Sequence, residues 1–133
     1  MTNEIINPKA AVVEWCNKMS RSVTRRNLNE HMSQISEKLH VYGVPGYEYL
    51  TFCDWEKRRR YEFKHNLLLS LTYKLIKIKS STPRRITFHS EETMRATSGK
   101  VIILNKDITL ELATDKECWQ SVEETIHNWQ TEE

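Results

Sequence analysis

The sequence predicts a single α+β domain over residues 1–133, in which helices come first and a curved antiparallel sheet follows. Apolar side chains recur at helical spacing in the first half of the chain, whereas from Leu67 onward they recur with the period of two typical of strands. A chain of 133 residues can build one sizeable core but not two. Long antiparallel strands preceded by helices favour one sheet that curls over the helices and leaves a cavity between the layers.

Two helices are expected near the start of the chain. The first begins at Pro8, because Asn7 can cap the free N–H groups and proline fits the first turn. Its apolar stripe comprises Val12, Trp15, Cys16, Met19 and Val23. A polar break at residues 24–27 separates it from a shorter helix, for which Asn27 is the expected cap. The apolar positions of the second helix are Leu28, Met32 and Ile35.

A short strand and a third helix are expected next. Residues 38–42 alternate between apolar and polar or aromatic side chains, which favours a strand, and the Gly-Val-Pro-Gly segment at 43–46 is typical of a turn. Thr51 begins the third helix, where Asp54 favours the positive end of the helix dipole. We expect this helix to end near His65.

Four long strands are then expected, joined as a meander. One face of the first strand carries Leu67, Leu69, Leu71, Tyr73 and Leu75. A break at residues 80–83 ends it, and the other strands cover 85–97, 101–112 and 118–129. The connecting turns are Ser98-Gly99 and residues 114–116, a bulge or kink is expected at 105–107, and the tail 130–133 is expected to be frayed.

The composition argues against several classes of partner. Twenty basic and 18 acidic side chains give a net charge of +2, whereas nucleic-acid-binding domains usually carry a marked basic excess. The longest apolar cluster, residues 67–71, is too short to span a membrane. Neither the three cysteines nor the histidines show metal-ligand spacing, so no metal is expected. With no signal-peptide pattern at residues 1–8, we expect a cytoplasmic protein with reduced thiols.

The strand over residues 85–97 carries the main candidate for a polar site. Its expected buried face holds Ile86, Phe88, Met94 and Ala96, and it is interrupted by Ser90 and Glu92. A carboxylate among apolar neighbours is costly unless it is paired or faces a wet cavity. Glu92 is therefore a candidate acid, base or hydrogen-bonding anchor, with Ser90 beside it. The alternatives are a salt bridge at the sheet rim or a register shift after a bulge.

In the opposite register His89 and Glu91 would face the pocket instead. A histidine next to a carboxylate can serve as an acid–base pair. Two such residues on one strand face are also typical of a solvated or dimer-facing pair. Both registers are open on the sequence alone.

Aromatic rings are spread over the elements expected to surround the cavity. Such rings can line an apolar ligand site, with tyrosine hydroxyls supplying polar contacts, or they can simply form the core. The residues expected to contact a ligand are Trp15, Tyr49, Trp55, Tyr73, Phe88, Ser90, Glu92 and Trp119. The basic run at residues 57–60 spreads around its helix and is interpreted as a solvated face; an anion or partner patch, joined by Lys64 and residues 84–85, is the alternative.

The order of elements resembles the nuclear transport factor 2-like superfamily, and within it the SnoaL-like group. Three segments carry the resemblance: residues 43–46 ahead of the third helix, residues 98–100 followed by 108–112 as the central hairpin, and Trp119 near the start of the last strand. The resemblance covers nearly the whole chain. It implies a cone-shaped, cystatin-like fold, with a pocket between the sheet and the helices on its concave face, and a homodimer formed through the outer sheet face.

The resemblance leaves the function open. The family includes isomerases, cyclases, hydrolases, dehydratases and domains that only bind. Its steroid isomerase-like members use a carboxylate base that faces an acid and a tyrosine, and no residue here matches those positions. The favoured hypothesis is a cofactor-free domain that binds a small hydrophobic molecule. The alternatives are an acid–base enzyme centred on Glu92 or on His89 and Glu91, and a protein-association module.

Overall fold

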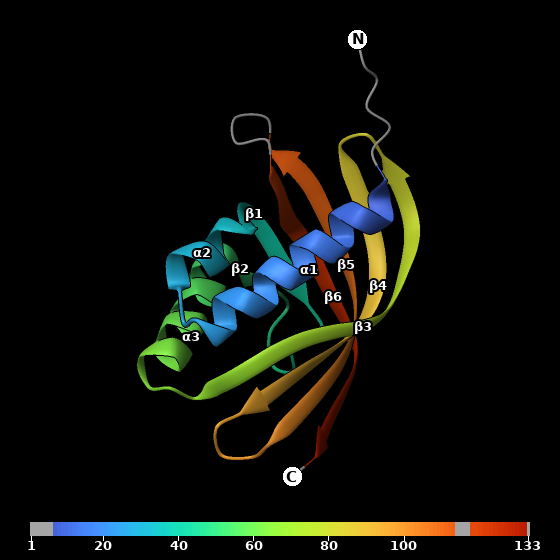
Figure 1. Cartoon of the computed structure of the whole chain (residues 1–133). Helices are drawn as coiled ribbons and strands as arrows, with labels where there is room; N and C mark the ends of the chain where they lie inside the picture. Colours follow the sequence, from blue (N-terminus) through green and yellow to red (C-terminus); the bar gives the residue numbers. More distant parts are fainter. Residues whose placement is uncertain (1–6, 114–117, 133) are drawn as a thin grey trace.

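The computed structural model describes residues 7–113 and 118–132. Three helices are seen in these residues: α1 (Pro8–Thr24), α2 (Leu28–Ser33) and α3 (Phe52–Lys64). The strands are β1 (Ile35–Tyr42), β2 (Leu50–Thr51), β3 (Leu68–Thr82), β4 (Arg85–Ala96), β5 (Val101–Ala113) and β6 (Cys118–Glu132). Figure 1 shows the helices lying across one face of a strongly curved sheet. We call that face the inner face, and the opposite one the outer face.

The strands form one sheet in the order β2-β1-β6-β5-β4-β3. The predicted meander from β3 to β6 is confirmed, because each of its strands pairs antiparallel with the next. The predicted fold class is confirmed, but the sheet is mixed and not antiparallel throughout, since β1 runs parallel to β6. A parallel neighbour needs a long connection, and here the whole meander separates the two strands.

Local capping fixes where the helices begin, as predicted. The side chain of Asn7 accepts a hydrogen bond from the backbone N–H of Ala10, at 3.2 Å. Asn27 caps α2 in the same way, at 3.0 Å. At α3, Thr51 and Asp54 exchange side-chain-to-backbone bonds in a capping box.

Several predicted boundaries need correction. Ile35 belongs to β1 and not to α2, because the helix ends at Ser33 and Ile35 pairs with Ser121. The two-residue strand β2 is not evident in the sequence. The break at 80–83 shrinks to residues 83–84, and residues 130–132 belong to β6 although they were expected to be frayed. The predicted turn at 114–116 falls outside the described residues.

Bulges in the long strands change which side chains face the helices. In β3 the register shifts between Leu68 and Ser70, so Leu68 and Leu71 are buried whereas Leu69 is exposed. The predicted face with Leu67, Leu69 and Leu75 is therefore wrong in part. In the pairing of β5 with β6, Val122 and His127 of β6 are bulged residues that have no β5 partner in the register. The irregularity predicted at 105–107 therefore lies on the partner strand.

The core lies between the helices and the inner face of the sheet. Trp15 of α1 packs against Tyr73 and Phe88, with ring centroids 5.7 and 6.2 Å apart. Alternate residues of β5, among them Ile108 and Leu110, are fully buried beneath them. Much of the cavity expected inside the cone is therefore filled by side chains.

Within residues 7–113 and 118–132, no helix is long and apolar enough to cross a membrane.

Candidate functional site

A hollow of about 210 Å³ lies between α3 and the inner face of the sheet, and we call it the α3 hollow. Helix α3 contributes Trp55, Arg58, Arg59 and Glu62, which share one helix face by their spacing. The sheet contributes Met94, Ile102, Leu104, Ile126 and Trp129. The bulge at His127 returns Trp129 to the inner face opposite Leu104. Because Trp129 is 43% exposed, it marks the open side of the hollow.

The guanidinium of Arg59 is the main polar group of the α3 hollow, and the residue is only 2% exposed. Its Nε donates to Nε2 of His31 at 3.2 Å, and its Nη1 donates to Glu62 at 2.6 Å. Among the residues that the structure describes, its Nη2 reaches only the thioether sulfur of Met94, at 3.9 Å, which is a weak acceptor. The guanidinium carbon also lies 4.8 Å from the ring centroid of Trp55, within cation–π range.

His31 connects the three helices and is uncharged. Burial lowers the pKa of His31 well below its usual value, and the neighbouring positive charge of Arg59 lowers it further. Since Nε2 accepts from Arg59, the ring proton sits on Nδ1 and is donated to Oγ of Ser22 at 2.9 Å. The Ser22 hydroxyl in turn donates to the carbonyl of Met19 at 2.7 Å. This series of hydrogen bonds, from Arg59 through His31 and Ser22 to the Met19 carbonyl, holds the guanidinium of Arg59 in a fixed position.

Deeper in the core, a lysine joins two glutamates. Lys106 Nζ donates to Glu92 at 3.0 Å and to Glu124 at 2.8 Å, and Glu124 also accepts from Ser121 at 2.8 Å. We call these four residues the Lys106 cluster. Burial alone would lower the pKa of Lys106, but the charges of Glu124 and Glu92 outweigh it and raise that pKa. Likewise Lys106 lowers the pKa of Glu124 despite its burial, so both groups stay ionised.

One oxygen of the Lys106 cluster lacks a partner. Among the described residues, Oε2 of Glu92 is buried and has no hydrogen-bond partner. Tyr73 lies opposite Glu92 on β3, and its pKa is raised well above the usual value by burial and then by the charge of Glu92. The Lys106 cluster does not line the α3 hollow. Glu92 is therefore an ion-paired interior group in this structure.

No protein-family model matches this chain, and no curated protein is similar to it in sequence. Solved structures do match its fold. A nuclear transport factor 2-like protein from Cytophaga hutchinsonii aligns with a TM-score of 0.72 and 7% identity, over 91% of this chain and 98% of that one. A protein of unknown function with a cystatin-like fold, from Nostoc punctiforme, aligns with a TM-score of 0.67 and 8% identity, over 89% and 88%. The chain has the nuclear transport factor 2-like fold.

A hexachlorocyclohexane dehydrochlorinase (LinA) also matches, with a TM-score of 0.59 and 6% identity over 94% of this chain and 88% of the enzyme. The nuclear transport factor 2-like fold thus occurs in a named enzyme and in a protein of unknown function. Fold alone does not select a function, so the argument depends on the side chains of this chain.

Only some of the residues predicted to contact a ligand line a hollow, and others lie in the packed core. Trp55 lines the α3 hollow, while the rings of Trp15, Tyr73 and Phe88 pack together in the core. Ser90 and Glu92 do face the interior, and Ser90 donates to a backbone carbonyl of β3 at 3.3 Å. Trp119 is half-buried and lines a hollow of about 70 Å³ beside Trp15.

Three predicted positions lie on the outer face and away from the α3 hollow. His89 bonds Asp107 at 2.8 Å and Glu91 pairs with Lys74 at 3.2 Å, so the register that would bring His89 and Glu91 into the pocket is wrong. Tyr49 is 40% exposed and packs against His40 with the rings tilted and their centroids 4.5 Å apart. The outer face thus presents aromatic and charged side chains to solvent. Homodimer formation through this face stays a prediction.

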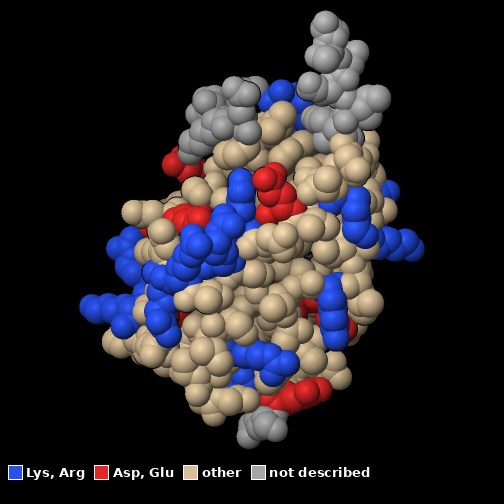
Figure 2. Space-filling view, in the orientation of Figure 1, with Lys and Arg blue, Asp and Glu red and all other residues tan. Residues whose placement is uncertain are grey.

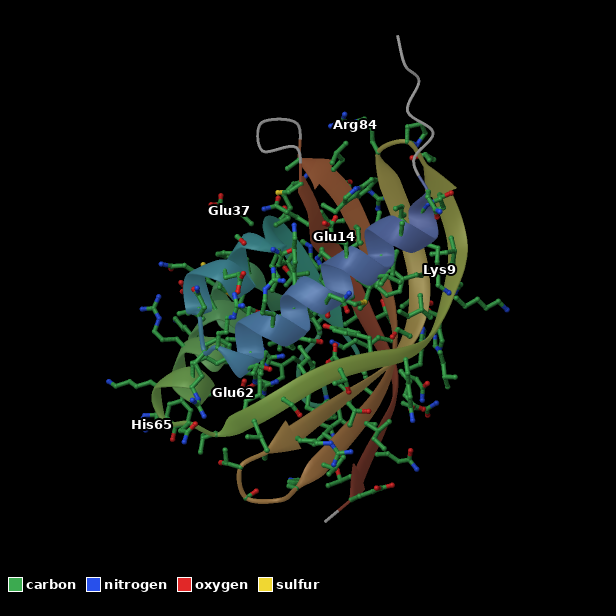
Figure 3. The ribbon with its side chains drawn as sticks, viewed as in Figure 1. Lys9, Glu14, Glu37, Glu62, His65 and Arg84 are labelled. Carbon is green, nitrogen blue, oxygen red and sulfur yellow. The ribbon has the colours of Figure 1, made fainter. Side chains whose placement is uncertain are left out.

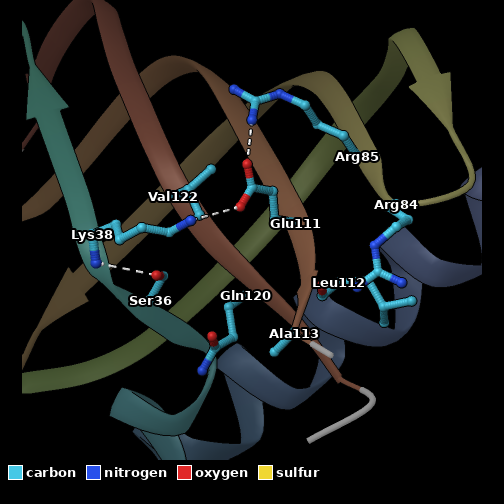
Figure 4. A pocket seen from close by; sticks show the side chains of 9 residues that line it. All are labelled: Ser36, Lys38, Arg84, Arg85, Glu111, Leu112, Ala113, Gln120 and Val122. Carbon is cyan, nitrogen blue, oxygen red and sulfur yellow. Dashed lines mark hydrogen bonds and ion pairs between the residues drawn. The ribbon is translucent and has the colours of Figure 1, made fainter. Parts of the chain in front are cut away.

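A larger hollow, of about 500 Å³, also lies on the outer face (Figure 4). Each of its charged side chains already has a partner, because Glu111 pairs with both Lys38 and Arg85, and Arg84 donates to the backbone carbonyl of Leu112 at 2.9 Å. Figure 3 shows Arg84 near the top of the molecule and Glu62 well below it, and the two hollows share no lining residue, so they are separate. Most side chains that line the outer hollow are charged or polar, which makes it the weaker site for an apolar ligand.

The basic run at residues 57–60 is divided by burial. Lys57, Arg58 and Arg60 are exposed, as predicted for a solvated face, and Arg60 pairs with Glu56 at 2.7 Å. Arg59 is the exception, since it points into the interior. In the view of Figure 2, Lys and Arg side chains gather over the side of the molecule that the helices form. Sequence reasoning missed Arg59, and also Lys106, whose parity with the buried Leu104 could have indicated it.

Proposed function

We propose that the protein binds a small, largely apolar molecule in the α3 hollow. The observation that carries this proposal is the lining, in which the rings of Trp55 and Trp129 stand with aliphatic side chains around about 210 Å³ of space. An apolar cavity of roughly 150 Å³ can hold a benzene ring, so a single-ring compound fits the α3 hollow. Small-molecule sites are typically concave and mostly apolar, with a few placed polar groups.

The burial and ion pairing of the Lys106 cluster favour a binding function over a catalytic one. Lys106 is fully paired with Glu92 and Glu124, and none of the three is more than 4% exposed. A substrate would have to break these ion pairs, or displace the residues above them, before it could reach the carboxylates. The α3 hollow needs no such rearrangement.

A matched pair of substitutions tests the proposal. Ile102 and Ile103 are neighbours on β5, and both are half-buried, but only Ile102 lines the α3 hollow. Ile102→Trp should fill the space and weaken binding of single-ring fragments at least about tenfold, whereas Ile103→Trp should leave it unchanged. Ligand-detected NMR against a fragment set measures this, with melting temperatures as the folding control. Equal binding by both variants and the unmodified chain would contradict the proposal.

A second candidate function is acid–base catalysis on a small hydrophobic substrate, and the unpartnered Oε2 of Glu92 favours it. A buried carboxylate oxygen without a donor is a group that could take a proton from a substrate. For any substrate that is found, Glu92→Gln should abolish turnover while binding in the α3 hollow persists. Turnover that survives Glu92→Gln would exclude this role.

A further inference from the structure

We infer that the ligand of the α3 hollow is a planar ring compound that carries one carboxylate, held by Arg59 and Arg58. The inference rests on the proposed function and specifies its chemistry. Arg59 is buried, yet within residues 7–113 and 118–132 its Nη2 has only the Met94 sulfur, at 3.9 Å, as a partner. A buried guanidinium nitrogen without an oxygen acceptor leaves hydrogen-bonding capacity unused, and Met94 lies in the wall of the α3 hollow.

Three cations surround the ring of Trp55. The guanidinium carbons of Arg59 and Arg58 lie 4.8 and 5.8 Å from its centroid, and Nζ of Lys106 lies 5.5 Å from it. Lys106 of the Lys106 cluster is thus one of the cations near this ring. An anion placed beside Trp55 would be attracted by all three positive charges.

The charges that line the α3 hollow are not balanced. Its walls hold Arg58, Arg59 and Glu62, which is two positive charges against one negative. Glu62 is taken by Arg59 at 2.6 Å, while in the part of the chain that the structure describes no ion pair involves Arg58. A carboxylate could accept from Nη2 of Arg59 and pair with Arg58. Its ring would then lie against the two tryptophans and the aliphatic wall.

Benzoate and benzyl alcohol form the test pair, since both place a single ring in the site and only benzoate brings a carboxylate. We expect benzoate to bind at least about tenfold more tightly, as judged by isothermal titration calorimetry. Arg58→Gln should weaken benzoate about two- to fivefold and leave benzyl alcohol unchanged. Lys57→Gln is the matched control, because Lys57 belongs to the same exposed run but does not line the α3 hollow.

The outcomes separate this inference from the proposed function. Equal affinity for both compounds, each lost in Ile102→Trp, would overturn the carboxylate while the binding function stands. Benzoate binding that survives Ile102→Trp, or that falls equally in Arg58→Gln and Lys57→Gln, would also overturn it, because the anion would then bind to general surface charge. Failure of both compounds and of the whole fragment set would instead remove the proposed function itself.

Discussion

Lys106 and Asp107 are neighbours on β5, and each is the centre of a charge cluster on an opposite face of the sheet. On the inner face, Lys106 binds two carboxylates. On the outer face, Asp107 accepts from Lys79 at 2.8 Å, His89 at 2.8 Å and His127 at 3.0 Å. We call these four outer residues the Asp107 cluster. Each cluster is built around one central charge, and the two central charges have opposite signs.

Burial is what separates the two clusters. The ion-pairing side chains of the Lys106 cluster are 1–4% exposed, whereas those of the Asp107 cluster are 19–50% exposed. Water and salt screen charges on the outer face, so each pair there contributes little. Inside, a charge that loses its partner cannot be hydrated, and breaking the set is costly. The Lys106 cluster is therefore expected to stabilise the packing that shapes the α3 hollow.

The largest expected effect is that of Lys106→Met. It leaves Glu92 and Glu124 as buried charges without a cation, and the free energy of unfolding should fall by about 3–5 kcal/mol. Urea denaturation followed by circular dichroism measures it. A loss below about 1 kcal/mol would mean that water reaches the cluster, and the contrast between the two faces would fail.

The free energy of unfolding should depend on pH through the shifted pKa values of both Glu124 and Lys106. The lowered pKa of Glu124 contributes stability that is present above about pH 4.5 and is lost as the pH falls through the folded-state value. The raised pKa of Lys106 contributes stability that is present below about pH 10.5 and is lost as the pH rises through its folded-state value. Denaturation midpoints measured between these limits should be insensitive to this pair. A decline that begins near neutral pH and vanishes in Lys106→Met would contradict the assignment.

The smallest expected effect is that of Asp107→Asn. Hydrogen bonds from Lys79, His89 and His127 outweigh burial and hold the pKa of Asp107 well below its usual value, but its partners are largely solvated. The substitution should cost at most about 1 kcal/mol, and less still at high salt. Denaturation at low and high ionic strength tests this. A salt-independent loss as large as that of Lys106→Met would show that the two faces do not differ.

The sequence predicted what local chemistry decides. Asn7, Asn27 and Thr51 indicated where the helices begin, because a cap acts within one turn. Alternation along β4 left two registers open, and the structure shows the one in which Glu92 faces the interior. The resemblance indicated the fold, but it could not indicate the parallel pairing of β1 with β6, which depends on contacts far apart in the chain.

Sequence reasoning failed where neighbours in space decide the environment. Glu124 escaped notice because the bulge at Val122 shifts the parity of β6, so simple alternation no longer indicates which side chains face the interior. Arg59 was hidden in a basic run that is otherwise exposed. Only the packing of α3 beside His31 shows that this one arginine is buried.

The central claim is that the α3 hollow is where a small molecule binds, and NMR mapping with benzoate tests it most directly. We predict that titration shifts the indole N–H signals of Trp55 and Trp129 and the methyl signals of Ile102, and leaves Ile103 on the outer face unmoved. Shifts confined to the outer hollow around Glu111, or to the surface of the basic helix, would contradict the claim.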